Sequence, residues 1–383
     1  MIKRKCYFKC LRTIFTIIIL FYILPLCSSA ESAETEFQGT VSAKSAVLYE
    51  PTSGRFLYQK CSNQRLPMAS TTKMMTALVV MDKCTINDTV TISSESTGIE
   101  GSSAYLQEGD EYTVLELLYA ILLQSANDAA TALAYHTAGG IEEFSNLMNK
   151  KAEDLCIKNS HFTNPHGLDD SEHYTTAEDL AKIGAALLKN DILKEIVSCN
   201  KKSFTYVERT RTYINHNKLL KSYDGSIGIK TGFTKKSGRC LVSAAERNGI
   251  TLISVTLDAP NDWIDHKRML DFGFCSLELL ELCHKGDYYQ EIKVLGGNKE
   301  SISISAKENI SIIKDKNTKI TNEYVSIPKY LIAPIEKNTV IGQAVFKGEN
   351  IEYTVDIVAN ESVTSTKKHN FIDKLIKRIT NIR

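Results

Sequence analysis

A serine and a lysine with the spacing of a catalytic pair open an apolar stretch of the chain. Ser70 and Lys73 stand at the two ends of the sequence STTK, and residues 74–81 are almost all apolar. On a helix, positions i and i+3 share a face, so we expect the hydroxyl of Ser70 to meet the amine of Lys73. The positive end of a helix also favours a developing alkoxide at its first turn. Such a pair suits nucleophilic attack by a hydroxyl group, with the amine as its base.

The Ser-x-x-Lys spacing is only weakly specific by itself. It occurs elsewhere in the chain, for example at Ser198–Lys201 and at Ser311–Lys314, where no long apolar helix follows. We interpret both as coincidences, and they show that the first motif needs support from other parts of the chain.

Ser125 and Asn127 follow the end of a helix predicted from Thr113 to Leu123, which is apolar on nearly all faces. Polar side chains at the end of so apolar a segment need hydrogen-bond partners. Simple helix capping would satisfy them. The functional alternative places the Ser125 hydroxyl beside the Lys73 amine and the Asn127 amide toward a substrate.

A third pattern, Lys230-Thr231-Gly232, occurs once in the chain, inside a predicted strand. A glycine in a strand lets a ligand approach the backbone closely. The lysine and threonine would then offer a cation and a hydroxyl group to a carboxylate. The alternative is an ordinary lysine on an edge strand.

Composition and spacing argue against several other kinds of site. The net charge is +1 over 383 residues, so no basic field for nucleic acid is expected. The eight histidines show no HExxH or similar spacing, and we expect neither a metal nor a cofactor. His166 is interpreted as structural rather than catalytic.

Strands at both ends of a helical region are predicted to form one sheet covered by helices. The predicted helices lie between residues 70 and 190, and another is expected from Trp263 to Phe274. The predicted strands are Ser45–Tyr49, Arg55–Gln59, Ile227–Thr234, Cys240–Glu246 and Ile250–Leu257.

The two ends of the chain differ from its middle. Residues 1–30 have a basic start, a short apolar run and small residues before a cut after Ala30, as in a secretory signal; an uncleaved membrane anchor is the alternative.

Residues 285–362 alternate with period two, which predicts a small all-β domain. Residues 366–383 carry an apolar helical face flanked by basic residues, which is typical of a helix lying in a membrane interface. The alternative is a helix packed on the β domain.

Ten cysteines include seven beyond residue 30, an odd number without C-x-x-C spacing. We expect buried free thiols, with one or two disulfides as the alternative.

The three motifs in this order resemble the penicillin-recognising serine hydrolases, and among them the low-molecular-mass D-alanyl-D-alanine carboxypeptidases. Nearly the whole chain after residue 30 takes part in the resemblance. The matching segments are Pro67–Thr76, Ser125–Ala130, Asn164–Leu168 and Asp224–Thr234. The resemblance implies a mixed α+β domain at residues 36–284, with a five-stranded antiparallel sheet covered by helices. The signal, the small β domain and the C-terminal amphipathic helix also match the plan of this family.

The resemblance also implies acyl transfer through an ester on a serine. Ser70 would be the nucleophile, Lys73 the base, and Ser125 a proton relay. A lysine with a pKa near 10.4 must lose its proton to act as a base. Burial and a nearby Lys230 cation would both lower this pKa.

Substrate contacts follow from the same resemblance. Asn127 would hold the peptide side chain, while Lys230, Thr231 and Gly232 would bind the terminal carboxylate. The backbone N–H groups of Ser70 and Phe233 would form the oxyanion hole; some relatives have histidine where this chain has Phe233. The expected partners are peptidoglycan stem peptides, β-lactams and the membrane surface.

Three other functions share parts of this pattern. A β-lactamase has the same motifs but needs rapid deacylation, and the small β domain and the C-terminal anchor would be superfluous in it. A transpeptidase would pass the acyl group to an amine, and a non-catalytic sensor would only bind. We expect an exported carboxypeptidase on the outer face of the cytoplasmic membrane.

Overall fold

The structure is a computed structural model that describes residues 37–205, 210–348 and 352–366. The predicted signal sequence lies outside the described residues, as does all but the first residue of the predicted C-terminal helix. Both therefore stay predictions. Within the described ranges, no helix is long and apolar enough to cross a membrane.

A five-stranded sheet forms the centre of the N-terminal part of the structure, and neighbouring strands in it are all antiparallel. This confirms the predicted sheet. The strands follow the order β2 (Arg55–Lys60), β1 (Ser45–Glu50), β9 (Ile250–Leu257), β8 (Gly238–Arg247) and β7 (Ser226–Thr234).

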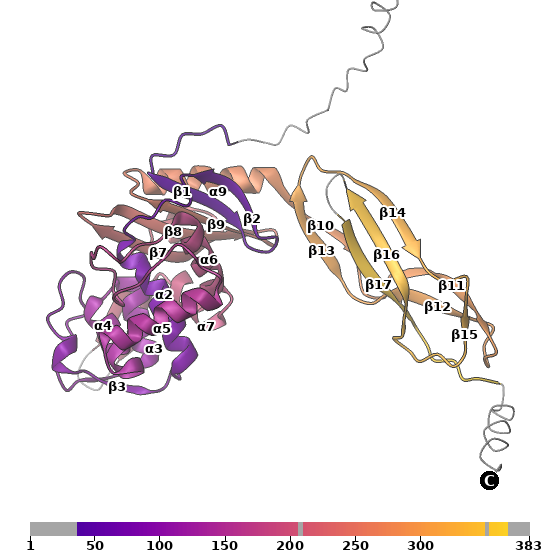
Figure 1. The fold of residues 1–383 in the computed structure, drawn as a ribbon, viewed down its shortest axis with the longest axis horizontal. Helices are drawn as coiled ribbons and strands as arrows, with labels where there is room; N and C mark the ends of the chain where they lie inside the picture. Colours follow the sequence, from indigo (N-terminus) through magenta and orange to yellow (C-terminus); the bar gives the residue numbers. More distant parts are fainter. Residues whose placement is uncertain (1–36, 206–209, 349–351, 367–383) are drawn as a thin grey trace, which may run out of the picture. The chain divides into compact units, whose positions relative to one another are not determined.

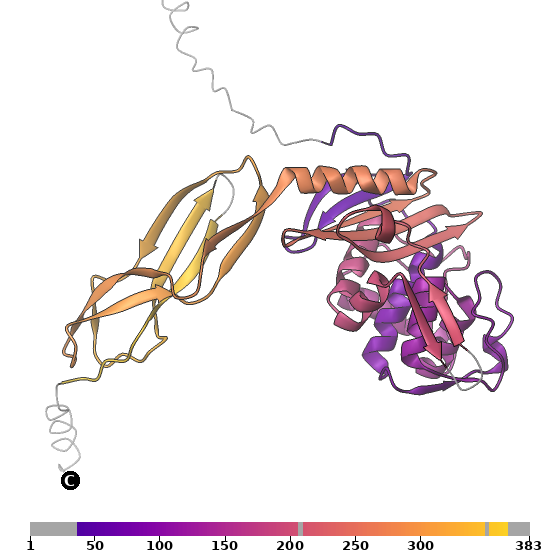
Figure 2. The same cartoon turned by 180° about the vertical axis from the view of Figure 1, so that it is seen from behind.

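The two faces of this sheet bury different hydrophobic clusters, because side chains alternate along a strand. On β1, Val47 packs into the larger cluster, with the helices of residues 73–198. Its neighbours Ala46 and Leu48 pack into the other cluster, with residues of α9 (Asp262–Ser276). Figure 2 shows α9 along one face of the sheet.

The helical region predicted between residues 70 and 190 covers the other face of the sheet (Figure 1). A short hairpin of β3 (Thr89–Thr91) and β4 (Glu111–Thr113) interrupts it, which the sequence did not predict. The segments that matter below are η1 (Ala69–Thr72), α2 (Lys73–Lys83), α3 (Val114–Tyr119), the π-helical turn η3 (Ala120–Gln124), α4 (Asn127–Ala138), α5 (Ile141–Asp154), α6 (Ala177–Leu188) and α7 (Asp191–Ser198).

The turns between strands follow their local chemistry. Asn248 and Gly249 join β8 to β9 with φ angles of 49° and 75°. Two consecutive positive φ angles belong to the two-residue hairpin turn predicted for Asn-Gly. Between α7 and β7, a hairpin of β5 (Lys201–Thr205) and β6 (Thr210–Ile214) precedes the short helix α8 (Leu219–Ser222).

The C-terminal part is all-β, as predicted. Six strands form one sheet in the order β14 (Ile320–Ser326), β16 (Val340–Gly348), β17 (Glu352–Ala359), β12 (Ser301–Ala306), β11 (Tyr288–Leu295) and β15 (Tyr330–Ile332). A separate pair joins β10 (Leu277–Cys283) to β13 (Ile310–Asp315). This pairing groups residues 277–283 with the strands that follow, although we expected the β domain to begin at residue 285.

All seven cysteines between Cys61 and Cys283 are free thiols. Only Cys240 and Cys283 are buried, and the other five are partly or fully exposed. The prediction that these thiols are buried is wrong for most of them.

Candidate active site

Ser70 and Lys73 meet as their spacing predicts. Ser70 lies in the 3-10 turn η1, and Lys73 is the first residue of α2. The Nζ atom of Lys73 lies 3.0 Å from the Oγ atom of Ser70. Ser70 is partly exposed, whereas Lys73 has no exposed surface. A reachable hydroxyl group therefore contacts a fully buried amine.

The Lys73 amine has three oxygen neighbours. Besides Ser70 Oγ, it contacts Asn127 Oδ1 at 2.7 Å and the backbone oxygen of His166 at 2.6 Å. As a free amine it has two N–H donors and one lone pair. The amide and carbonyl oxygens can only accept, so they take the two N–H groups. The lone pair then faces the Ser70 hydroxyl, which is the geometry of a base.

Two effects lower the pKa of Lys73 well below its ordinary value. Burial is the larger, because removal from water disfavours the ammonium form. The cation of Lys230 is the second, and the carboxylate of Asp128 opposes both. The environment therefore favours the free amine that the mechanism requires.

The turn from Asn164 to Leu168 brings the backbone oxygen of His166 to Lys73. The Asn164 side chain accepts a hydrogen bond from the N–H of Gly167 at 2.7 Å and donates one to the oxygen of Leu168 at 3.1 Å. Burial, Lys73 and His173 lower the pKa of the His166 imidazole to about 3, so the ring is neutral at neutral pH. His166 thus acts through its backbone, in line with its interpretation as structural.

Gly167 allows this turn to lie against η1. Its φ is +89°, and a Cβ atom there would lie 2.0 Å from the backbone oxygen of Ala69. We expect Gly167→Ala to lower the free energy of unfolding by more than about 3 kcal/mol, since the left-handed conformation and a backbone clash add together. Gly139 is the matched control, because its φ is +81° but nothing lies within 4 Å of the added atom.

Chemical denaturation of both variants tests this expectation. Gly139→Ala should cost about 1–2 kcal/mol, from the backbone conformation alone. Equal losses in the two variants would contradict the close contact between the turn and η1.

Ser125 and Asn127 lie at the site but have different partners from those expected. The Oδ1 atom of Asn127 accepts from Lys73, and its Nδ2 donates to the backbone oxygen of Glu100 at 2.5 Å. We expected this amide to face the substrate. Ser125 Oγ accepts from the Nζ of Lys230 at 3.0 Å, whereas we expected it beside Lys73.

The backbone at Ser125 has a left-handed conformation, with φ 66° and ψ 28°, directly after the π-helical turn η3. Non-glycine residues in such conformations cluster at functional sites. The turn ends η3 and lets α4 begin at Asn127, so the two polar side chains project from a helix break.

Strand β7 supplies the second lysine. Lys230 is 1% exposed, and its Nζ donates to Ser125 Oγ and to the backbone oxygen of Thr231 at 2.9 Å. Burial lowers its pKa to about 7. Because β7 is the last strand of the sheet, its outer edge is free of a strand partner within that sheet.

Gly232 lets the protein's own backbone lie close to β7, and the close approach of a ligand there stays a prediction. A Cβ atom at Gly232 would lie 3.1 Å from both Met68 O and Ser70 N. The glycine therefore lets β7 pack against the turn that carries the nucleophile. The next residue, Phe233, has a side chain that is 65% exposed.

His173 supports the same turn and was not singled out from the sequence. Its Nδ1 accepts from the backbone N–H of Thr163 at 3.0 Å, so its Nε2 donates to Thr72 Oγ1 at 2.7 Å. That hydroxyl in turn donates to the oxygen of Ala69 at 2.8 Å. The pKa of His173 falls to about 4, chiefly through burial, which keeps this neutral arrangement.

Asp128 is a second residue that the sequence analysis did not single out. Its carboxylate accepts from the Ser103 hydroxyl at 2.6 Å and from the backbone N–H groups of Ala104 and Leu106. It thereby anchors the loop whose Glu100 oxygen holds Asn127. Its position directly after Asn127 was the only signal in the sequence.

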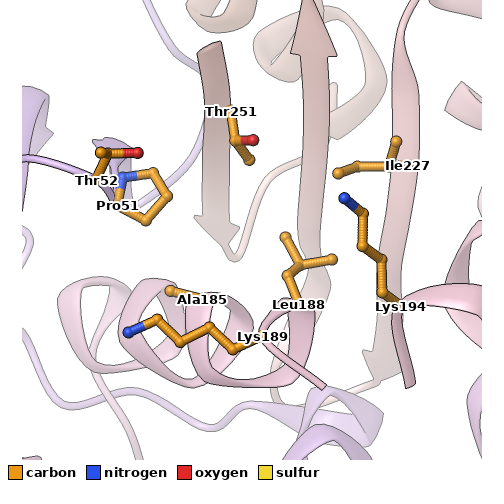
Figure 3. Close-up of a pocket in the computed structure, with 8 residues that line it drawn as sticks. All are labelled: Pro51, Thr52, Ala185, Leu188, Lys189, Lys194, Ile227 and Thr251. Atoms are coloured by element: carbon orange, nitrogen blue, oxygen red, sulfur yellow. The ribbon is translucent and has the colours of Figure 1, made fainter. Parts of the chain in front are cut away.

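A surface pocket of about 400 Å³ lies apart from these residues (Figure 3). Lys189 and Lys194 lie at its rim, but no predicted site residue lines it. It has no nucleophile–base pair, so we assign no chemistry to it.

Comparison with known proteins agrees with this geometry. A family model described as D-alanyl-D-alanine carboxypeptidase matches residues 30–261, which is more than half of the chain. The chain belongs to the D-alanyl-D-alanine carboxypeptidase family. A second model, the C-terminal domain of penicillin-binding protein 5, matches residues 278–365 and so includes nearly all of β10.

Relatives of this family resemble the chain over most of its length. D-alanyl-D-alanine carboxypeptidase DacF of Bacillus subtilis (strain 168) is 32% identical over 384 residues, covering 95% of this chain and 96% of that protein. A solved penicillin-binding protein 5 from Haemophilus influenzae has a TM-score of 0.66 and 30% identity, covering 85% of this chain and 99% of its own. The solved structure of PBP3 from Streptococcus pneumoniae has a TM-score of 0.70 and 26% identity. The match covers 85% of this chain and 100% of that one.

Proposed function

We propose that the protein is a serine-type D-alanyl-D-alanine carboxypeptidase that removes the last D-alanine from peptidoglycan stem peptides. One observation carries the proposal. A fully buried lysine amine, with its pKa lowered, contacts a reachable serine hydroxyl while two other oxygens occupy its N–H groups. Family membership supplies the substrate class.

In the proposed reaction, the Ser70 oxygen attacks the carbonyl carbon between the two D-alanines and its proton passes to the Lys73 amine. The tetrahedral oxyanion is held by the backbone N–H groups of Ser70 and Phe233. The packing of Gly232 against Met68 and Ser70 supports this assignment, because it brings the two backbone segments together. One such donor contributes about 3 kcal/mol to transition-state stability.

Collapse of this intermediate breaks the C–N bond and leaves an ester on Ser70. The leaving nitrogen takes a proton from the Lys73 ammonium; passage through Ser125 would require its hydroxyl, which contacts Lys230 at 3.0 Å, to turn toward Lys73. D-alanine departs, and a water molecule then attacks the ester after giving a proton to Lys73. The bond between the Ser70 oxygen and the acyl carbon breaks, the shortened peptide is freed, and the proton on Lys73 returns to the Ser70 oxygen.

Lys230 and Thr231 would bind the terminal carboxylate. A buried ammonium group is costly without an anionic partner, and Lys230 Nζ donates to two neutral oxygens. A substrate carboxylate would supply the missing negative charge. This arrangement selects the ends of peptide chains.

We predict a bell-shaped dependence of kcat/KM on pH, because the two lysines must hold opposite protonation states. Lys73 acts as a free amine, so activity rises with pH through its lowered pKa. Lys230 acts as a cation, so activity falls as pH rises through its pKa of about 7. The two limbs are linked, because the Lys230 cation also lowers the pKa of Lys73.

The variant Lys230→Arg tests the alkaline limb, since a guanidinium group keeps its charge at all accessible pH values. We expect lower activity overall, with the fall above neutral pH removed and the acid limb kept. An unchanged alkaline limb would show that another group is responsible.

Penicillin labelling tests the function directly. Trypsin cleaves after Arg65 and Lys73, so a penicilloyl adduct on Ser70 should appear on the peptide of residues 66–73. A stable adduct, together with D-alanine release from a pentapeptide stem, supports the proposal. Rapid turnover of penicillin would favour a β-lactamase, and transfer of the acyl group to an added amine would favour a transpeptidase. An adduct without any D-alanine release would favour a non-catalytic sensor.

We also propose that the protein is exported and binds the membrane surface through residues 366–383. The basic and apolar pattern of that segment supports this, since anionic lipid attracts such a helix. Mature protein should sediment with vesicles containing anionic lipid, and protein ending at residue 365 should not. Equal binding of both forms would overturn the membrane assignment.

A further inference from the structure

Three metal-ligand side chains meet at the end of α2 opposite the active site. The sulfur of Cys84, a carboxylate oxygen of Asp88 and a ring nitrogen of His136 all lie within 4.8 Å of one another. We call these residues the Cys84 cluster. Cys84 and Asp88 are partly buried, and His136 is exposed.

The backbone holds the first two ligands in place. Cys84 is the C-terminal cap of α2, and its N–H donates to the oxygen of Val80 at 2.9 Å. Asp88 accepts from the backbone N–H of Thr85 at 2.8 Å and from its hydroxyl at 2.6 Å. Hydrogen bonds of this kind orient a carboxylate for metal binding while leaving lone pairs for an ion.

The third ligand comes from a distant part of the chain. His136 lies in the last turn of α4, beside Thr137, whose Oγ1 lies 3.4 Å from the Cys84 sulfur. Two helices, α2 and α4, therefore end at the same place. The negative ends of their dipoles favour a cation there.

The donor atoms indicate which cation would bind. One thiolate, one imidazole and one carboxylate match the ligand preferences of zinc, which takes four ligands in a tetrahedron. Metal–ligand bonds of about 2.0–2.3 Å place tetrahedral ligand atoms within the separations found here. A water molecule would complete the set.

We propose that the Cys84 cluster binds a divalent zinc-type cation. Binding displaces the thiol proton of Cys84 to solvent, because the thiolate is the ligand. The ion would join the far ends of the two helices that begin with Lys73 and Asn127. Eleven residues of α2 separate it from the active site, about 16 Å along the helix. Its role would be to hold α2 and α4 together, with no part in the acyl transfer.

Cobalt(II) titration of the full-length mature protein provides the first test. A cobalt ion bound by a thiolate in a tetrahedral site gives a charge-transfer band in the near ultraviolet and intense visible bands. We expect both bands at one cobalt per chain in the wild-type protein. Cys84→Ser should abolish the thiolate band, and His136→Gln should weaken binding by at least about tenfold.

Cys275→Ser is the matched control, because Cys275 is an exposed free thiol on α9. This variant should bind cobalt as the wild type does. Zinc at about 100 times its dissociation constant should raise the Tm of the wild type and of this control by roughly 5–10 °C, but not that of Cys84→Ser.

Several outcomes would overturn the proposal. They are the absence of a cobalt band at micromolar concentrations, a band that survives in Cys84→Ser, and an equal zinc-dependent Tm shift in all variants. D-alanine release without added metal should stay within twofold of wild type in Cys84→Ser, which separates this test from that of the proposed function.

Discussion

Replacing Ser70 with alanine is expected to lower kcat/KM for D-alanine release by at least about 10⁴-fold. The hydroxyl oxygen forms the covalent ester, so nothing in the variant can take its place. The partly exposed position of Ser70 means that the loss should be chemical rather than structural. The penicilloyl adduct on residues 66–73 should vanish as well. Release assays and intact-protein mass spectrometry measure both effects.

The chain offers a matched control for this variant. Ser311 heads another Ser-x-x-Lys sequence but is exposed on strand β13. Ser311→Ala should keep full activity and full penicillin labelling. If Ser70→Ala kept more than a few per cent of wild-type activity, the serine mechanism proposed here would be wrong.

Replacing Lys73 with methionine is expected to lower kcat/KM by at least about 10³-fold, because a general base and its proton transfers are lost together. Methionine keeps a similar volume in a fully buried position. It leaves Asn127 Oδ1 and His166 O without their donor, at a cost of about 1–3 kcal/mol each in stability. Thermal unfolding should therefore accompany the kinetic measurement, to show that the variant is folded at the assay temperature.

The pH profile separates a base from a residue that only positions the serine. If Lys73 is the base, the acid limb of kcat/KM disappears in Lys73→Met, and the residual activity rises with hydroxide concentration. Retention of the wild-type acid limb would assign that limb to another group. Lys201→Met is the control, because Lys201 ends another Ser-x-x-Lys sequence but is an exposed residue at the start of β5, and its replacement should change neither rate nor profile.

Local patterns were sufficient for much of the fold. Strand-forming runs bounded by turn signals predicted the strands that became β1, β8 and β9, and Asn248-Gly249 predicted the hairpin that joins β8 to β9. The sequence also predicted a helix start at Thr113. In the structure the Thr113 side chain caps that helix, because it accepts a hydrogen bond from the N–H of Glu116 at 3.2 Å. These signals are visible because hydrogen bonds and side-chain alternation within an element involve neighbours in the sequence.

The partners of the polar side chains were less predictable. Ser125 contacts Lys230 and Asn127 contacts Lys73, where we had expected Ser125 beside Lys73 and Asn127 toward the substrate. The left-handed residue after the π-helical turn decides this, because it rotates the following side chains by an amount that no spacing rule gives. The Cys84 cluster could not be predicted from the sequence for a similar reason. His136 follows Asp88 by 48 residues and lies on α4, whereas Cys84 ends α2.

The sequence by itself determined the family, the order of the motifs and the contact between Ser70 and Lys73, because that contact spans one helical turn. Only the tertiary structure decided that Lys73 has no exposed surface and lies within reach of the Lys230 charge. The pKa of an amine depends on the water it loses and on the charges around it. Both are set by packing between segments more than 150 residues apart, so the reactivity of the site is a property of the folded chain.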